Sequence, residues 1–166
     1  MISSIKKKIS LIILMAYLIP DVILGYCEDF VHFLIPRCFR RKKTITGQTV
    51  LITGAGSGVG RQLAIEFSKH SVCLVMLDVN RSSLILTEKL LNPGSRTFIY
   101  DCDVSDRERV YQVARDIKEQ VGKVDILVNN EGIVSGKGLL EIPDEKIEKT
   151  MQVNSLSHFW VSFSCS

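Results

Sequence analysis

The sequence predicts an α/β fold with a doubly wound parallel sheet, of which this chain carries the first four strands. Three observations predict it. Strand-like and helix-like patterns alternate along residues 50–154. Val72–Leu77 is almost continuously apolar, as expected for a parallel strand buried on both faces. The run Val50–Gly60 leads from apolar strand residues through a glycine-rich turn into helical spacing.

The elements are expected in the following order. Strands are predicted at 50–53, 72–77, 96–100 and 124–128, and helices at 58–70, 82–91 and 105–121. Ser105 is expected to cap its helix, with Glu108 completing a capping box. A loop follows at 133–143, and Asp144 begins a last helix that runs past Asn154. Alternation of strands and helices of this kind indicates βαβ units in a parallel sheet.

Composition limits the kind of protein. The 166 residues suffice for one domain and a short appendage, and 46% hydrophobic with 23% charged residues is globular. The net charge of +3 is uneven, because 1–43 contain eight basic and three acidic residues while the remainder is slightly acidic. No nucleic-acid surface is therefore expected. The five cysteines form no C-x-x-C pair, which favours a reducing, cytosol-facing domain without a metal site.

Residues 1–43 differ from the rest. Three lysines precede the apolar run Ile9–Ile19, Pro20-Asp21 interrupts it, and a basic cluster follows at 37–43. The apolar stretch is shorter than the roughly 20 residues of a spanning helix. A cleaved secretory signal is one interpretation, but no small-x-small cleavage site is evident. We favour an uncleaved hydrophobic membrane anchor at 1–43, either a short signal-anchor or a bent helix pair in one leaflet, followed by a domain at 44–166.

The glycine turn is the strongest motif. Its spacing is T-G-x-x-x-G-x-G, carried by Thr53, Gly54, Gly58 and Gly60, and it lies between a strand and a helix. Such a turn brings backbone N–H groups and a helix N-terminus to a pyrophosphate. No Gly-Lys-Ser/Thr follows, which excludes a P-loop. The turn predicts a Rossmann-like, partial dinucleotide-binding domain.

Asp78 ends the second strand, 24 residues after Gly54. A carboxylate there accepts the ribose hydroxyls of NAD and repels a 2′-phosphate. The alternative is that Asp78 only caps the following helix. Arg81 lies nearby and leaves NADP possible as a cofactor, although Ser57, before Gly58, provides no basic partner for the phosphate.

Three further motifs lie after the third strand, after the fourth strand and in the helix that follows. These are Asp103-Val104, Asn129-Asn130-Glu131-Gly132 and, in the next helix, Asn154. Together with the glycine turn and Asp78, they resemble the short-chain dehydrogenase/reductase family from about Gly47 to Asn154. Gly132–Gly136, His158-Phe159-Trp160 and the anchor-like start are similar to its membrane-bound retinol and 17β-hydroxysteroid dehydrogenase branch.

The resemblance implies the strand order 3-2-1-4, with 124–128 as an exposed edge. It also implies specific roles for individual residues. The pyrophosphate would lie on Thr53, Gly54, Ser57, Gly58, Val59 and Gly60. Asp78 would hold the adenosine ribose, Asp103 and Val104 the adenine, and Asn130 and Gly132 the cofactor backbone, with Asn129 bracing the sheet. Asn154 would be the asparagine of the catalytic tetrad. The reaction would be hydride transfer between NAD(P) and a lipophilic alcohol or ketone, of retinoid or steroid type, at the endoplasmic reticulum membrane or a lipid droplet.

The sequence departs from the family in two ways. The catalytic serine and Tyr-x-x-x-Lys are absent, because none of the four tyrosines (Tyr17, Tyr26, Tyr100, Tyr111) has a lysine four residues on. Glu131 replaces the usual alanine, which adds bulk and charge near an anionic cofactor. In the family the catalytic serine and tyrosine come well after the position of Asn154, on elements that this sequence does not reach. We therefore expect a C-terminally truncated form, with an impaired activity and without the family's usual homo-oligomer. The alternative is a non-catalytic nucleotide-binding product.

Overall fold

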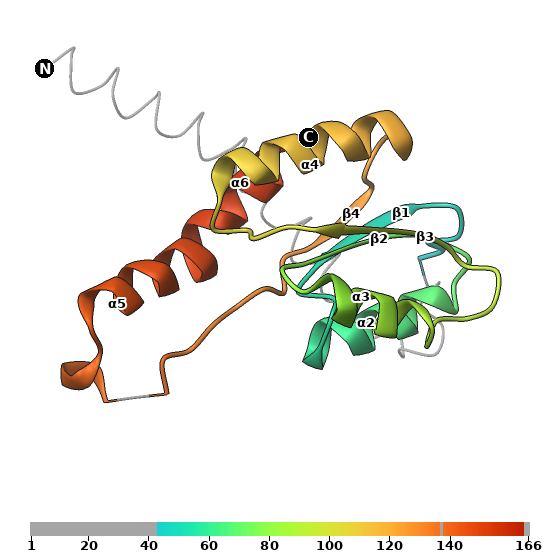
Figure 1. Cartoon of the computed structure of the whole chain (residues 1–166). Coiled ribbons are helices and arrows are strands. Elements are labelled where there is room, and N and C mark those ends of the chain that lie inside the picture. Colours follow the sequence, from blue (N-terminus) through green and yellow to red (C-terminus); the bar gives the residue numbers. More distant parts are fainter. Residues whose placement is uncertain (1–42, 137, 165–166) are drawn as a thin grey trace, which may run out of the picture. The chain divides into compact units, whose positions relative to one another are not determined.

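A four-stranded parallel sheet lies at the centre of the computed structural model (Figure 1). Its strands are β1 (Thr49–Thr53), β2 (Cys73–Asp78), β3 (Arg96–Asp101) and β4 (Ile126–Val128). They are ordered β3-β2-β1-β4, and all three pairings are parallel. The predicted strand order and direction are therefore confirmed.

The structure describes residues 43–136 and 138–164. The anchor predicted at 1–43 lies outside these residues, except for Lys43, and stays a prediction. Within the described ranges, no helix has the length and apolar character needed to cross a membrane. Ile45–Ser166 form one compact unit.

Helices cover both faces of the sheet (Figure 1). On one face, α2 (Gly58–Ser68) and α3 (Arg81–Glu88) pack over a core that includes Val50, Ile52, Ala64, Leu74, Met76 and Leu84. On the other, α4 (Arg107–Gln120) and α6 (Ser157–Ser164) pack over a core that includes Leu51, Val75, Leu77, Val110, Val113 and Val161. Successive residues of β1 enter opposite cores because side chains alternate along a strand. This explains the uninterrupted apolar runs Val50–Ile52 in β1 and Leu74–Leu77 in β2.

The edge strand β4 is shorter than predicted. It pairs through Ile126–Val128 with β1, and its residues are half-buried. Asp125 lies just before it, where its carboxylate accepts the Thr49 N–H at 3.0 Å and its own N–H donates to the Thr49 carbonyl at 2.9 Å. The Asp125 side chain thus accepts a hydrogen bond that a backbone carbonyl would accept in a regular strand. For this reason β4 begins at Ile126 and is shorter than the predicted 124–128.

The start of α4 also differs from the prediction. Asp106, and not Ser105, caps the helix, and its side chain accepts the Arg109 N–H at 3.1 Å. The Ser105 hydroxyl donates instead to Asp103 at 2.6 Å. The predicted capping box is wrong because a neighbouring carboxylate competes for the serine.

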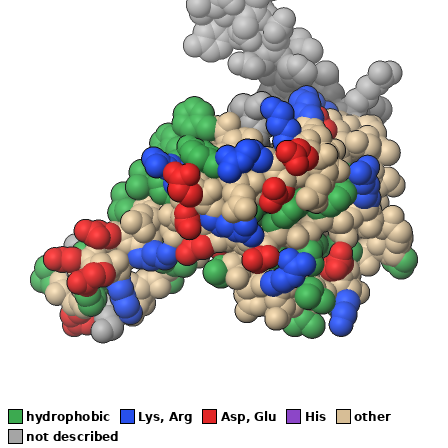
Figure 2. Space-filling model, turned by 45° about the horizontal axis from the view of Figure 1, so that its top comes forward, with side chains coloured by type: hydrophobic (Ala, Val, Ile, Leu, Met, Phe, Trp, Pro, Cys, Tyr) green, Lys and Arg blue, Asp and Glu red, His purple; other side chains and the backbone are tan. Residues whose placement is uncertain are grey.

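The predicted last helix is interrupted. It consists of α5 (Asp144–Met151), a π-helical turn η3 (Gln152–Leu156) and α6, and the preceding loop contains a short 3-10 helix η2 (Leu139–Glu141). Acidic and basic side chains mingle over the protruding α5 end of the molecule (Figure 2). Its charged residues are exposed, namely Asp144, Glu145, Lys146, Glu148 and Lys149.

Candidate functional site

The carboxyl edge of the sheet brings the predicted site residues together. In the strand register Thr53 lies beside Leu77, and Asp78 lies beside Asp101. The segments that follow all four strands therefore meet at one edge, which is where ligands bind in open α/β sheets.

The glycine turn packs closely because two of its glycines have no room for a side chain. A Cβ on Gly60 would lie 2.1 Å from the Gly54 carbonyl oxygen and 2.6 Å from Asn130 Nδ2. A Cβ on Gly56 would lie 2.7 Å from Asp78 Oδ2. Gly58, by contrast, faces open space at a φ of +51°. The turn is thus tight on the sheet side and open at the start of α2, as a cradle for a ligand must be.

The N-terminus of α2 is available to an anion. Ser57 has extended backbone angles, and its side chain makes no capping hydrogen bond. The first turn contains no acidic residue. Ser57 and Val59 are exposed, and among the described residues no side chain accepts a hydrogen bond from the backbone N–H groups of this first helical turn. These N–H groups and the positive end of the helix dipole suit a phosphate.

Asp78 supports the turn from the end of β2. The residue is 8% exposed. Its Oδ2 accepts the Gly56 N–H at 2.9 Å and its Oδ1 accepts the Asn80 N–H at 2.9 Å. Asn80 caps α3 by accepting the Ser83 N–H at 3.1 Å, so the alternative that Asp78 caps this helix is wrong. Each carboxylate oxygen retains a second acceptor position for a ribose hydroxyl.

Thr53 and Asn130 join β1 to β4, a connection that the sequence analysis missed. The Thr53 hydroxyl accepts the N–H groups of Asn130 and Glu131 at 3.0 and 3.1 Å. Asn130 Nδ2 donates to the Thr53 carbonyl at 3.0 Å. The side chain and the backbone N–H of Asn130 are therefore engaged with β1, and a contact with a cofactor would fall to its backbone carbonyl. A threonine ending one strand and an asparagine after its neighbour are the signal that could have shown this.

Asn129 does not have the bracing role implied for it. Its amide donates to Ser162 Oγ in α6 at 3.3 Å. The bracing contact belongs to Asn130, one residue later. Asn129 instead links the end of β4 to α6.

Asp103 and Val104 differ in what they offer a ligand. Val104 is 1% exposed in the core beneath α4, so contact with an adenine would come from its backbone. Asp103 Oδ1 accepts the Ser105 N–H at 2.9 Å, and its Oδ2 pairs with Lys149 Nζ at 3.0 Å. Lys149 also donates to the Ser105 hydroxyl. Burial raises the pKa of Asp103, but the hydrogen bonds from Ser105 and Lys149 outweigh it, and the net pKa is lowered.

Asn154 lies in the π-helical turn and reaches the segment that follows β4. Its Oδ1 accepts the Ile133 N–H at 2.8 Å and its Nδ2 donates to the Ile133 carbonyl at 2.8 Å. A Cβ on Gly132 would lie 3.7 Å from Asn154 Oδ1. The structure therefore brings Asn154 and Gly132 together at the site edge.

Glu131 lies against the glycine turn. Its Oε2 is 3.4 Å from the position that a Cβ on Gly54 would take. This oxygen is buried and has no hydrogen-bond partner among the described residues. Burial, and then the charges of Asp78 and Asp103, raise the pKa of Glu131 to about 7.

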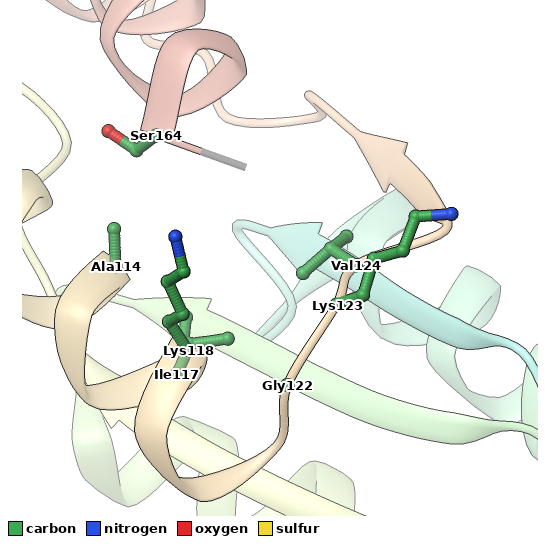
Figure 3. A pocket seen from close by; sticks show the side chains of 7 residues that line it. All are labelled: Ala114, Ile117, Lys118, Gly122, Lys123, Val124 and Ser164. Carbon is green, nitrogen blue, oxygen red and sulfur yellow. The ribbon is translucent and has the colours of Figure 1, made fainter. Parts of the chain in front are cut away.

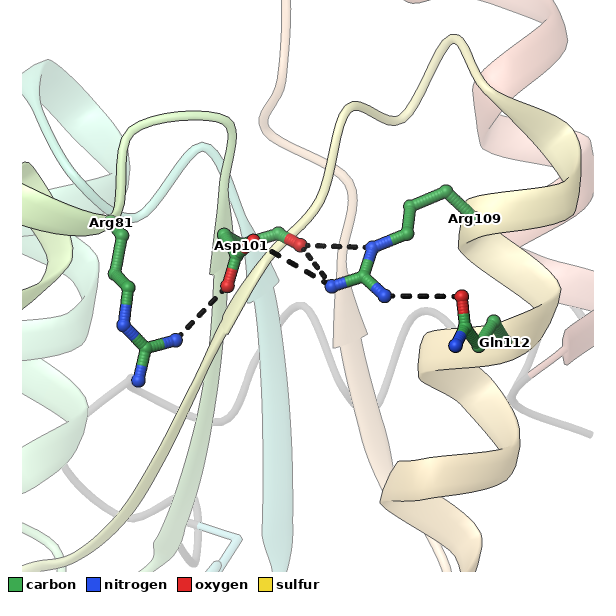
Figure 4. Close-up of polar contacts among 4 residues, drawn as sticks. All are labelled: Arg81, Asp101, Arg109 and Gln112. Atoms are coloured by element: carbon green, nitrogen blue, oxygen red, sulfur yellow. Dashed lines mark hydrogen bonds and ion pairs between the residues drawn. The ribbon is translucent and has the colours of Figure 1, made fainter.

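Arg81 is engaged at the outer rim of the site. Its guanidinium pairs with Asp101 Oδ1 at 3.0 Å, and Asp101 also pairs with Arg109, whose Nη2 lies 3.7 Å from Oδ2 (Figure 4). Arg109 donates to the Asp101 carbonyl as well, and to Gln112. Arg81, the cation that could bind the 2′-phosphate of NADP, is thus paired with Asp101.

A separate hollow lies between α4, the approach to β4 and the end of α6 (Figure 3). Its lining is Ala114, Ile117, Lys118, Gly122, Lys123, Val124 and Ser164. None of these residues belongs to the glycine turn or follows a strand at the carboxyl edge. The hollow is therefore distinct from the candidate site.

Comparison with known proteins agrees with this geometry. Residues 48–166 match the family described as short chain dehydrogenase. A 17-beta-hydroxysteroid dehydrogenase 13 of Mus musculus is 42% identical over 153 residues, 92% of this chain and 49% of that protein. An estradiol 17-beta-dehydrogenase 11 of Homo sapiens is 44% identical over 87% of this chain and 48% of its own length. A retinol dehydrogenase 10-B of Danio rerio is 41% identical over 74% of this chain and 43% of its own length. The chain spans slightly less than half of each of these relatives.

Solved structures share the fold. An NAD+-bound xylitol dehydrogenase superimposes with a TM-score of 0.70 at 26% identity, covering 74% of this chain and 48% of that one. An L-sorbose reductase from Gluconobacter frateurii, complexed with NADPH and L-sorbose, has a TM-score of 0.66 at 28% identity. The match covers 73% of this chain and 47% of the reductase. The strand order, the glycine turn and the match over residues 48–166 lead to one conclusion: the chain belongs to the short-chain dehydrogenase family.

Proposed function

We propose that the domain binds NAD as the cofactor-binding part of a short-chain oxidoreductase. The observation that carries this proposal is the cradle at Gly54–Gly60, where Gly60 admits no Cβ and the N-terminus of α2 carries no side-chain cap. Pyrophosphate is the ligand that such a turn suits best. NAD-bound and NADPH-bound proteins among the structural neighbours support the assignment.

The residues of the cradle divide the cofactor between them. The backbone of Gly54, Gly58 and Val59 would hold the pyrophosphate, and Asp78 the adenosine ribose. A bound NAD supplies a nicotinamide ring that accepts a hydride from a carbinol carbon. NAD is favoured over NADP because the Asp78 carboxylate repels a 2′-phosphate and Asp101 occupies Arg81.

The proposed substrate is a lipophilic alcohol or ketone of retinoid or steroid type. The names of the relatives, two steroid dehydrogenases and a retinol dehydrogenase, support this class. The similarity to the mouse relative covers 92% of the chain, so it extends beyond Ile45–Ser166 into the N-terminal segment. Attachment to an endoplasmic reticulum or lipid-droplet membrane through residues 1–43, with the domain facing the cytosol, is part of the proposal.

A second candidate is nucleotide binding without catalysis. The printed sequence contains no Tyr-x-x-x-Lys. Under this alternative, the chain binds the cofactor but oxidises no alcohol.

Two measurements on the full chain separate the candidates. Isothermal titration with NAD+ and NADP+ tests the cradle, and Asp78→Ala should weaken NAD+ binding more than NADP+ binding. Reduction of NAD+ in the presence of retinol or a 17β-hydroxysteroid tests catalysis. Binding with turnover supports the oxidoreductase, binding without turnover supports the second candidate, and no binding refutes both.

A further inference from the structure

Glu131 is an acidic group in an anion-binding place. It follows β4, where its backbone N–H donates to the Thr53 hydroxyl at 3.1 Å and holds the residue at the carboxyl edge. Its Oε2 then lies 3.4 Å from the Cβ position of Gly54, the first glycine of the cradle. A charged carboxylate here opposes a pyrophosphate on the same turn.

No cation among the described residues pairs with this carboxylate. Asp78 at the end of β2 and Asp103 after β3 both oppose its charge. The nearby Cys102 thiol, whose pKa burial raises to about 12, stays neutral. Lys149 of α5 is bound to Asp103 at 3.0 Å and to Ser105. The Gly54 backbone alone favours the charged form of Glu131.

We propose that Glu131 couples occupancy of the glycine cradle to protonation, so that NAD+ binds the form of the protein in which this side chain carries a proton. The proposal rests on the proposed function and adds a proton to it. Protonation removes the charge that opposes the pyrophosphate. Protonation also turns Oε2, which has no hydrogen-bond partner among the described residues, into an O–H group that can donate to a phosphate oxygen or a backbone carbonyl.

The expected size of the effect follows from titration near pH 7. If only the protonated form binds, the Kd of NAD+ at pH 8 is about tenfold weaker than at pH 6, since each pH unit above the pKa costs a factor of ten. The pyrophosphate keeps its charge over this range, so the change belongs to the protein. At pH 7 binding takes up about half a proton.

The test is calorimetry of NAD+ binding to the full chain at pH 6, 7 and 8, repeated at pH 7 in two buffers of different ionisation enthalpy. The wild type should show the tenfold change and the proton uptake. Glu131→Gln, or Glu131→Ala as a second neutral variant, should show less than a twofold change and no uptake. Glu119→Gln removes an exposed carboxylate at the far end of α4 and should behave as wild type.

Each outcome has one meaning. Wild-type binding with a constant Kd and no proton uptake overturns the inference and leaves the proposed function standing. An equal pH dependence in Glu131→Gln also overturns it. No NAD+ binding by wild type or by either Glu131 variant at any pH refutes the proposed function, and the inference with it.

Discussion

Asn154 and Ile133 exchange two hydrogen bonds of 2.8 Å, between a side-chain amide on one side and a backbone N–H and C=O on the other. The amide thereby satisfies both polar groups of a residue in the segment that follows β4. Gly132, the preceding residue, lies beside the π-helical turn η3, since a Cβ on it would be 3.7 Å from Asn154 Oδ1. One side chain thus links the π-helical turn to the edge of the candidate site.

Asn154→Ala should loosen this segment. It removes both hydrogen bonds, and we expect a loss of about 1–2 kcal/mol in the free energy of unfolding. Hydrogen exchange at the amide of Ile133 should accelerate, as measured by mass spectrometry on the folded chain. Ser155→Ala, on the same turn, is the matched control. Unchanged hydrogen exchange at Ile133 in Asn154→Ala would show that the Asn154 side chain does not stabilise this segment.

Gly60→Ala and Gly58→Ala should differ in their effect on stability. At Gly60 the added Cβ meets the Gly54 carbonyl at 2.1 Å, so α2 must move away from β1, at a cost of about 3 kcal/mol or more. At Gly58 the space is open, and a φ of +51° costs only about 1–2 kcal/mol. Urea unfolding of the two variants measures the difference. Equal losses would mean that the close approach of α2 to β1 does not limit the fold.

Glu131 should make stability fall as the pH rises. Its pKa in the folded protein is about 7, against an ordinary 4.5, so the folded state holds a proton that the unfolded state has released. The contribution of protonated Glu131 to the free energy of unfolding is fully present below pH 4.5 and is lost as the pH rises through 7. Between pH 5 and 8 the free energy of unfolding of the wild type should fall by about 1–2 kcal/mol relative to Glu131→Gln. The loss is smaller than the pKa shift alone would give, because the side chain is only partly buried and solvent screens its charge.

Urea unfolding at the two pH values measures this loss. Glu119→Gln serves as the control for removing one carboxylate. A constant difference between wild type and Glu131→Gln from pH 5 to 8 would contradict the prediction.

Asp101→Asn should shift the cofactor preference toward NADP. The exposed pair between Arg81 and Asp101 restrains the guanidinium, and its loss frees Arg81 for a 2′-phosphate. Because exposed pairs contribute at most about 1 kcal/mol, the Kd of NADP+ should improve about two- to fivefold. The added substitution Arg81→Ala should abolish the gain. Glu108→Gln removes the carboxylate of another exposed pair and controls for net charge. A gain that survives Arg81→Ala would refute this role.

Periodicity and glycine spacing were sufficient to predict a parallel sheet with a strand-to-helix glycine turn, and the resemblance to the short-chain dehydrogenase/reductase family added the strand order. Val72–Leu77 is apolar on every residue but Cys73, and Gly54, Gly58 and Gly60 mark a strand-to-helix turn, so both features follow from local patterns. The turn appears as predicted, with Gly54 and Gly58 at positive φ.

Contacts between distant residues were not predictable in the same way. Ser105 has the local pattern of a helix cap, but Asp103 binds its hydroxyl and Asp106 takes its place. Asn130 has the pattern of a ligand-binding residue, yet its amide lies 3.0 Å from the Thr53 carbonyl, 77 positions away. A polar side chain at a strand end can serve either a ligand or the neighbouring strand, and only the fold decides which.

The most direct test of the account is a map of NAD+ contacts on the isotope-labelled full chain by NMR. We predict amide shift changes at Gly54–Gly60, at Val104 and at Glu131–Gly132 when NAD+ is added at pH 6. Changes confined to the hollow lined by Ala114, Ile117 and Val124, or no changes at all, would contradict the assignment of the glycine turn as the cofactor site.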